Sequence, residues 1–292
     1  MIFIPSFVEI KNEEGTPIEH LKKYVSLLSN HTKRNVIVYY SGWLSVPEGL
    51  PTGINDLDMN GFMAMTHGLK FKKGLDLVLH TPGGSVAATE AIINYIYKMF
   101  KGNVRAIVPQ LAMSGGTMMA CSCKEIIMGK QSSLGPIDPQ FNGVPAQGLI
   151  SEFNKAREEI NNDSSAIPLW QPIISQYHPT LLNSCQNAID WSNEIFEESL
   201  RRNMFLGEDD DKLIQSIMDV FESHENTKAH DRHLPLDKCR EVGLKVTALE
   251  DDDDLQDYAL SIHHSCMEIF ESSHTYKIFC NQNIDLSYNY QI

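Results

Sequence analysis

The sequence predicts an α/β fold in which a parallel β-sheet is covered by helices. Two features carry this prediction: short, continuous apolar runs, and segments between them with apolar residues at helical spacing. Continuous apolar runs are typical of parallel strands buried on both faces, and their alternation with helices is typical of α/β proteins. The 292 residues suffice for one large domain of this class, or for one domain with an appendage.

The segment before residue 75 is expected to form a helix, a strand and a second helix. Residues 16–31, "TPIEHLKKYVSLLSNH", have apolar side chains at helical spacing. Residues 35–43, "NVIVYYSGW", are a predicted strand. Apolar residues recur every three to four positions in residues 54–69, which predicts the second helix. The first of these helices, residues 16–31, therefore leads into the sheet.

Residues 74–129 continue the alternation in the order strand, helix, strand, helix, strand. The five segments are "GLDLVLHT", "SVAATEAIINYIYKMF", "NVRAIVPQ", "SGGTMMACSC" and "KEIIMG". This is the pattern of repeated strand–helix units and predicts the centre of the parallel sheet.

The rest of the chain is expected to be mostly helical. A loop rich in Gly and Pro precedes a predicted helix, "LISEFNKAREEI", and three further helical segments follow a polar linker. The last 21 residues have no readable pattern. We therefore expect three parts: an N-terminal helical lead-in (residues 1–34), a core (residues 35–160) and a helical C-terminal extension packed on the core (residues 161–292).

Charge and apolar patterning exclude several classes of partner. The net charge of −14 opposes binding to nucleic acid or to an anionic membrane. There is no run of about 18 apolar residues, and the start of the sequence has no basic region followed by a cleavage site. We expect no membrane span and a cytoplasmic location.

No metal or cofactor site is predicted. The six cysteines have no CxxC or Cys/His ligand spacing, which favours buried, reduced thiols over a zinc site or disulfides. The run "EDDDDLQDY" is interpreted as a solvated acidic segment, because adjacent carboxylates repel one another.

Gly83 and Gly84 close the predicted strand at residues 74–81, where the chain turns sharply into a helix. Glycine suits such a turn because it adopts positive φ and lets backbone approach closely, and the following helix exposes unpaired N–H groups. The phosphate motifs GxxxxGK[ST] and GxGxxG are absent, so nucleotide binding is disfavoured. Two interpretations remain: a tight turn without a ligand, or an oxyanion hole.

A second turn thirty residues later favours the oxyanion hole. Ser114 follows a predicted strand and stands before Gly115 at the start of a helix, a placement that suits a nucleophile. Neighbouring parallel strands end at the same edge of a sheet, so the two turns are expected to face each other. Amides of Gly83 or Gly84 and of Gly115 would then flank a carbonyl attacked by Ser114. Taken alone, Ser114 is better interpreted as a helix N-cap.

The motifs "HTPGGSV", "AMSGGTMMA" and "KEIIMGKQSSLGPIDPQ" together resemble the Clp-protease/crotonase superfamily. Within it the chain is similar to the signal peptide peptidase A-like serine peptidases, and most of all to the serine dehydrogenase proteinases. The resemblance is strong over residues 35–142. It implies a Clp/crotonase-like spiral fold, a catalytic core with Ser114 as nucleophile, an oxyanion hole from Gly83, Gly84 and Gly115, and a homo-oligomer.

The base that would activate Ser114 is left open by the resemblance. Clp-type peptidases carry a His-Gln-Pro pattern where this chain has Ile137-Asp138-Pro139, so their histidine is missing. Signal peptide peptidase A-like enzymes use a lysine, which makes Lys155 the leading candidate and predicts a Ser-Lys dyad. An ordinary solvated helix lysine is nearly as good an interpretation. His178, in a loop before a long helix, is the alternative base.

The functional prediction is a cytosolic serine endopeptidase that hydrolyses peptide bonds through an acyl-enzyme on Ser114, with peptide or protein substrates and no cofactor. One alternative is a crotonase-type acyl-CoA enzyme, which would use the same oxyanion hole without needing the serine. The other is a non-catalytic assembly or binding protein that keeps the fold but has lost the base.

Overall fold

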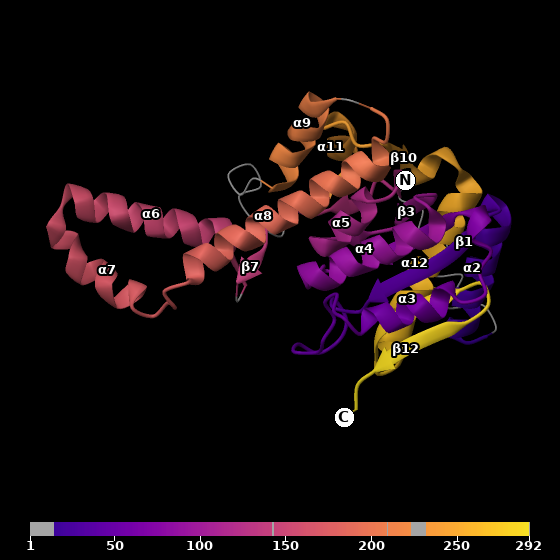
Figure 1. The fold of residues 1–292 in the computed structure, drawn as a ribbon. Coiled ribbons are helices and arrows are strands. Elements are labelled where there is room, and N and C mark those ends of the chain that lie inside the picture. The colour runs from indigo at the N-terminus through magenta and orange to yellow at the C-terminus, as the bar shows by residue number, and fades with distance from the viewer. Residues whose placement is uncertain (1–14, 142, 209, 223–231, 292) are drawn as a thin grey trace.

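The computed structural model describes residues 15–141, 143–208, 210–222 and 232–291 (Figure 1). Its centre is a seven-stranded sheet in the order β10-β5-β3-β2-β1-β11-β12. The strands are β1 (Asn35–Ser41), β2 (Leu75–His80), β3 (Val104–Val108), β5 (Glu125–Met128), β10 (Val246–Ala248), β11 (Thr275–Asn281) and β12 (Asp285–Asn289). From β10 to β1 all neighbours are parallel, whereas β11 and β12 pair antiparallel. The predicted α/β class with a largely parallel sheet is confirmed.

Helices cover both faces of this sheet. The helices of the described residues, including two that lie away from the sheet, are α2 (Pro17–Thr32), α3 (Asp58–Thr66), α4 (Val86–Phe100), α5 (Gly115–Cys121), α6 (Ala146–Asn162), α7 (Ile167–Ile174), α8 (Leu181–Ser199), α9 (Asp211–Glu222), α11 (Leu236–Glu241) and α12 (Asp253–Ser272), with short helical turns η1 (Phe71–Lys73), η2 (Ser164–Ala166), η3 (Leu200–Met204) and η4 (Leu249–Asp251). Every residue of β1 and β2 is buried, as continuous apolar strands require. One core cluster joins the sheet to α2 and α12, and a larger one joins its other face to α3, α4, α5 and α8.

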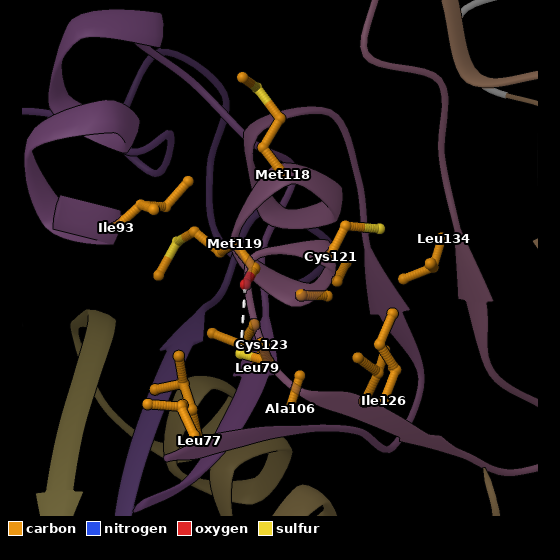
Figure 2. Packing of buried hydrophobic residues seen from close by; sticks show 14 of the residues in the cluster. Leu77, Leu79, Ile93, Ala106, Met118, Met119, Cys121, Cys123, Ile126 and Leu134 are labelled. Carbon is orange, nitrogen blue, oxygen red and sulfur yellow. Dashed lines mark hydrogen bonds between the residues drawn. The ribbon is translucent and has the colours of Figure 1, made fainter. Parts of the chain in front are cut away.

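Helix α5 directly follows the second predicted turn and lies in the core. All of its residues are buried. Figure 2 shows Met119 above the strand residues Leu77 and Ala106, while Met118 projects from the opposite side of the helix. The Cys123 thiol donates to the Met119 carbonyl oxygen at 3.4 Å. Close packing on the sheet therefore fixes where this helix begins.

The remaining strands of the described residues form two small sheets. The first contains β4 (Leu111–Ala112), β6 (Ser133–Leu134) and β9 (Leu234–Pro235). The second is the hairpin of β7 (Gln140–Phe141) and β8 (Val144–Pro145). The first sheet lies beside the carboxyl end of β2, because Thr81 forms a parallel bridge with Ala112 of β4.

The C-terminal part needs a correction, since it is not only helical. Strand β10 extends the sheet beside β5, and β11 pairs with the first strand, β1. The sequence pattern misses β11 because a charged residue, Lys277, interrupts its apolar run, and it misses β12 because that strand has no fully buried residue. The division into parts at residues 34 and 160 stays a prediction.

Residues 146–180, which we call the arm, extend away from the sheet (Figure 1). The arm contains α6 and α7, and it contacts the start of α8 through a small cluster that includes Leu149 and Cys185. This differs from the expectation that the whole segment after residue 160 packs on the core. The later turns of α8 and all of α9 do pack there, through Phe196 and Phe221.

Candidate active site

The structure places the two glycine-containing turns side by side. The Thr81 amide donates to the Leu111 carbonyl oxygen at 3.1 Å, and the Met113 amide donates to the Thr81 carbonyl oxygen at 2.9 Å. These bonds continue β2 into a short parallel pairing with β4. Each chain then turns into a helix, α4 after Gly84 and α5 after Ser114.

Gly83 fills the contact between the turns. Its φ is +89°, and a Cβ built there would lie 2.6 Å from the Ser114 Cβ and 2.8 Å from the Gly115 nitrogen. These separations are far below van der Waals contact. No side chain fits at position 83, because Ser114 occupies the space.

The other side of the first turn is held by Ile54. Its amide donates to the Gly83 carbonyl oxygen at 2.7 Å, and its carbonyl oxygen accepts from the Ser85 amide at 2.8 Å. A Cβ at Gly84 would overlap the backbone nitrogen and oxygen of Ile54. The glycine pair is thus clamped between Ile54 and Ser114.

Ser114 has an unusual backbone conformation. Its φ is 50° and its ψ is −115°, and it precedes the first residue of α5. A non-glycine residue in such a region costs about 1–3 kcal/mol and persists only where its surroundings hold it there, often at functional sites. Lys33 and Lys101, which also have positive φ, are by contrast left-handed caps at the ends of helices.

Hydrogen bonding distinguishes Ser114 from an ordinary N-cap. Its side chain makes no capping bond and, within the described ranges, donates to no other group. Ser85 does cap its helix, since its hydroxyl accepts from the Ala88 amide at 3.3 Å. The Ser114 hydroxyl is half-buried and unengaged, as a nucleophile at the mouth of a pocket would be.

The three predicted oxyanion amides are not equivalent. The Gly83 N–H donates to the Thr81 hydroxyl at 3.2 Å. For the amides of Gly84 and Gly115, the described residues provide no hydrogen-bond acceptor. Of the three, these two are therefore available to an oxygen of a ligand.

A pocket of about 440 Å³, the Ser114 pocket, opens at this junction. Ser114, Gly115 and the glycine pair line one part of it, and Asp138, Phe141 and Ala188 line others. It therefore combines a hydroxyl and two unengaged amides with room for a peptide side chain.

The structure does not bring Lys155 or His178 into this pocket. Lys155 lies in the middle of α6; its side chain is 59% exposed, and its Nζ is 3.7 Å from a carboxylate oxygen of Glu152. His178 is exposed in the loop after α7, with its Nδ1 2.9 Å from the Thr180 hydroxyl. Both belong to the arm, and neither lines the pocket. Their role as base stays a prediction.

His80 is near in sequence to the first turn but is buried away from the pocket. Its ring lies 4.3 Å from the Trp43 ring and 5.1 Å from the Tyr40 ring, between centroids. Burial lowers the pKa of His80 well below its ordinary value, and the neighbouring His263 adds to this shift. The ring is held neutral and packs at the end of β2.

A buried ion pair supports the site, and no sequence pattern pointed to it. Lys277 Nζ lies 2.8 Å from both carboxylate oxygens of Asp58 and donates to the Gly53 carbonyl oxygen at 2.7 Å. Tyr39 donates its hydroxyl to Asp58 at 2.8 Å. Burial lowers the pKa of Lys277, and attraction to the Asp58 carboxylate opposes this shift. Since Gly53 lines the pocket and precedes Ile54, the pair anchors the clamp on the glycine turn.

Replacing Lys277 by methionine should lower the free energy of unfolding by about 3–5 kcal/mol, because it leaves the buried Asp58 charge without its partner. Urea denaturation measures this. The double variant Asp58→Asn/Lys277→Met should recover part of the loss. The control is Lys22→Met, which removes an exposed ion pair with Asp285 and should cost at most about 1 kcal/mol. Equal losses for the two single lysine variants would contradict this role.

In the described ranges, no three His, Cys, Asp or Glu side chains come together as a metal site would require. No helix in those ranges is both long and apolar enough to cross a bilayer. All six cysteines are buried and free.

Comparison with known proteins identifies the family. A model of the family described as ClpP-like SDH-type serine proteinase matches residues 64–253, well over half of the chain, including both turns. The chain is 30% identical over 174 residues to Uncharacterized protein MJ0137 of Methanocaldococcus jannaschii. The matched region covers 60% of this chain and 54% of that protein. It is 29% identical over 172 residues to Uncharacterized protein MJ1495 of the same organism, at 59% and 51% coverage. The chain spans about half the length of these relatives.

Proposed function

The chain belongs to the ClpP-like SDH-type serine proteinases, and on that basis we propose that it hydrolyses peptide bonds through an acyl-enzyme on Ser114. One observation carries the proposal. An unengaged serine hydroxyl, held at positive φ, lines the same pocket as two amides without hydrogen bonds, those of Gly84 and Gly115.

The reaction follows from this arrangement. The Ser114 oxygen bonds to the peptide carbonyl carbon while its proton passes to a base, and the Gly84 and Gly115 amides donate to the resulting oxyanion. The C–N bond then breaks and the base returns the proton to the leaving amine. Water hydrolyses the ester and frees Ser114.

The direct test uses the purified chain with two classes of substrate. We expect it to release peptides from an unfolded protein such as casein and to leave acyl-CoA thioesters unchanged. Turnover of the thioesters without peptide release would favour the crotonase-type alternative. Absence of both activities would favour a non-catalytic role.

For the base, we propose Lys155 in a Ser-Lys dyad, with His178 as the alternative. In one chain the arm holds Lys155 outside the pocket, so this role requires movement of the arm or a second copy of the chain. Exposed apolar side chains on the arm, those of Ile167, Leu169 and Ile173, support a homo-oligomer.

Lys155→Ala should abolish peptide hydrolysis, because a serine hydroxyl is a weak nucleophile without a base. Initial rates on a fluorogenic peptide measure this. Lys212→Ala, which changes the next lysine along the chain and is also exposed, is the control and should stay active. If a second copy supplies Lys155, mixing inactive Ser114→Ala and Lys155→Ala chains should restore some activity. An active Lys155→Ala and an inactive His178→Ala would replace the dyad with a histidine mechanism.

A further inference from the structure

Thr81 is the residue at which the two turns of the site meet. Its amide donates to the Leu111 carbonyl oxygen, and its carbonyl oxygen accepts from the amide of Met113, directly before Ser114. The Thr81 side chain is fully buried and does not line the Ser114 pocket. Any effect of Thr81 on the reaction must therefore pass through the residues that it holds.

The two ends of the Thr81 side chain contact different turns. Its hydroxyl oxygen accepts from the Gly83 amide at 3.2 Å. Its methyl group lies against the start of α5, since a Cβ built at Gly116 would overlap Thr81 Cγ2. The hydroxyl therefore holds the first turn, and the methyl group packs against the second.

Gly83 joins two peptide groups whose directions decide where the Gly84 amide points. Thr81 holds the first of these groups through the Gly83 N–H, and the Ile54 amide holds the second by donating to the Gly83 carbonyl oxygen at 2.7 Å. In a planar trans peptide the N–H points opposite to the C=O, so the Gly84 N–H points away from Ile54. Since the glycine pair lies between Ile54 and Ser114, the N–H is directed to the side that Ser114 occupies.

The turn depends on both of these hydrogen bonds. Gly83 has a φ of +89° and no side chain to restrict its dihedral angles. If its N–H lost its acceptor, rotation about Gly83 would carry the Gly84 amide away from the Gly115 amide. An oxyanion donor must lie about 2.7–3.1 Å from the oxygen, so a small rotation is enough to lose one bond.

The Thr81 hydroxyl is itself supported from the core. Burial raises the pKa of Tyr39 well above its ordinary value, the Asp58 carboxylate adds to this shift, and a hydrogen bond with Thr81 opposes it. The Tyr39 hydroxyl donates to Asp58, which pairs with Lys277. A hydroxyl can donate one bond while it accepts others, so Thr81 can donate to Tyr39 and accept from Gly83 at the same time.

We propose that Thr81 is a positioning residue for the oxyanion hole, acting through the hydrogen bond from the Gly83 amide to its hydroxyl. This bond keeps the Gly84 amide aligned with that of Gly115. The inference rests on the proposed peptidase function. The methyl group has a separate role in packing against α5, so the two ends of the side chain can be tested by different substitutions.

Thr81→Val keeps the branched shape and removes the hydroxyl. For a fluorogenic peptide, kcat should fall at least about 10-fold because one donor loses its alignment, while KM should change less than about threefold. Thr81→Ser keeps the hydroxyl and should retain kcat within about threefold, with some loss of stability from the missing methyl group. A folded Thr81→Val with the wild-type kcat would overturn the proposal, as would equal losses of kcat in the two variants.

A second pair applies if Thr81→Val does not fold. Thr81→Ser and Thr81→Ala both lack the methyl group and differ only in the hydroxyl, so kcat should be at least about 10-fold lower for alanine. Equal values would contradict the proposal. The control, Thr66→Val, removes another buried hydroxyl, which donates to the Met63 carbonyl oxygen at 3.0 Å and lies outside the pocket lining. It should lose stability in urea denaturation and keep its kcat.

Binding separates this inference from the proposed activity. In a Ser114→Ala background, the fluorescein-labelled peptide Ala-Ala-Ala-Leu should bind at least about fivefold more tightly as the free acid than as the C-terminal amide, because aligned N–H donors favour an anionic oxygen. Adding Thr81→Val should remove this preference. Absence of the preference with Thr81 in place would contradict the aligned pair of amides.

The two proposals can fail separately. If no peptide is hydrolysed but the preference for the acid is present and depends on Thr81, the peptidase proposal fails and the positioning role stands. If Thr81→Val hydrolyses peptides with the wild-type kcat, the positioning role fails and the peptidase proposal stands.

Discussion

Replacing Ser114 by alanine is expected to remove peptide hydrolysis and to leave the fold intact. Loss of the nucleophile in a serine protease costs on the order of 10⁶-fold in kcat, and the remaining rate comes from the oxyanion hole and substrate binding. Stability should be unchanged, because the Ser114 hydroxyl makes no hydrogen bond in the described structure and alanine keeps the same backbone constraints. Hydrolysis rates and urea denaturation measure the two quantities.

Ser85→Ala is the matched comparison for stability. Its hydroxyl caps α4, so its loss should lower the free energy of unfolding by about 0.5–2 kcal/mol. The Ser114→Ala variant should show no such loss. Turnover by Ser114→Ala at the wild-type rate would contradict the role of this residue as nucleophile.

Replacing Gly84 by alanine should reduce both activity and stability. The new Cβ would overlap the backbone of Ile54, so the turn must move, and overpacking of this kind costs about 1–3 kcal/mol. Movement of the turn would displace the Gly84 amide relative to the Gly115 amide, so that the two could no longer donate to the same oxygen of a ligand. Loss of one oxyanion donor reduces kcat by about 10²–10³-fold. Peptide hydrolysis and urea denaturation of the soluble variant measure the two effects.

Gly49→Ala is the control for the backbone penalty. Gly49 also has positive φ, but a Cβ there would meet no atom within 4 Å and the residue does not line the pocket. This variant should lose a little stability and keep its activity. If Gly84→Ala is folded and equally active, the glycine pair is only a tight turn.

The same physical property, a buried parallel sheet, explains why the sequence predicts both the class of fold and the closeness of the two turns. Buried parallel strands need continuous apolar runs, and neighbouring parallel strands end at one edge of the sheet. Gly83 and Ser114 are therefore brought together by features that are local in sequence. The structure adds that the Gly83 amide is already engaged by Thr81, a detail of hydrogen bonding that spacing cannot reveal.

The parts that sequence could not predict depend on long-range contacts. Lys277 and Asp58 are 219 residues apart, and nothing near either residue indicates that they pair. The helical spacing of residues 149–160 predicts α6, but periodicity cannot say whether its apolar face meets the sheet or another part of the arm. The position of Lys155 relative to Ser114 was unpredictable for the same reason.

Labelling with a fluorophosphonate probe, followed by mass spectrometry of the proteolytic fragments, tests the central claim most directly. The probe reacts with a serine hydroxyl that a base activates beside an oxyanion hole. We predict one probe per chain, attached to Ser114, and no labelling of Ser114→Ala. An unlabelled wild-type chain, or a label on another residue that persists in Ser114→Ala, would contradict the assignment of Ser114 as the nucleophile.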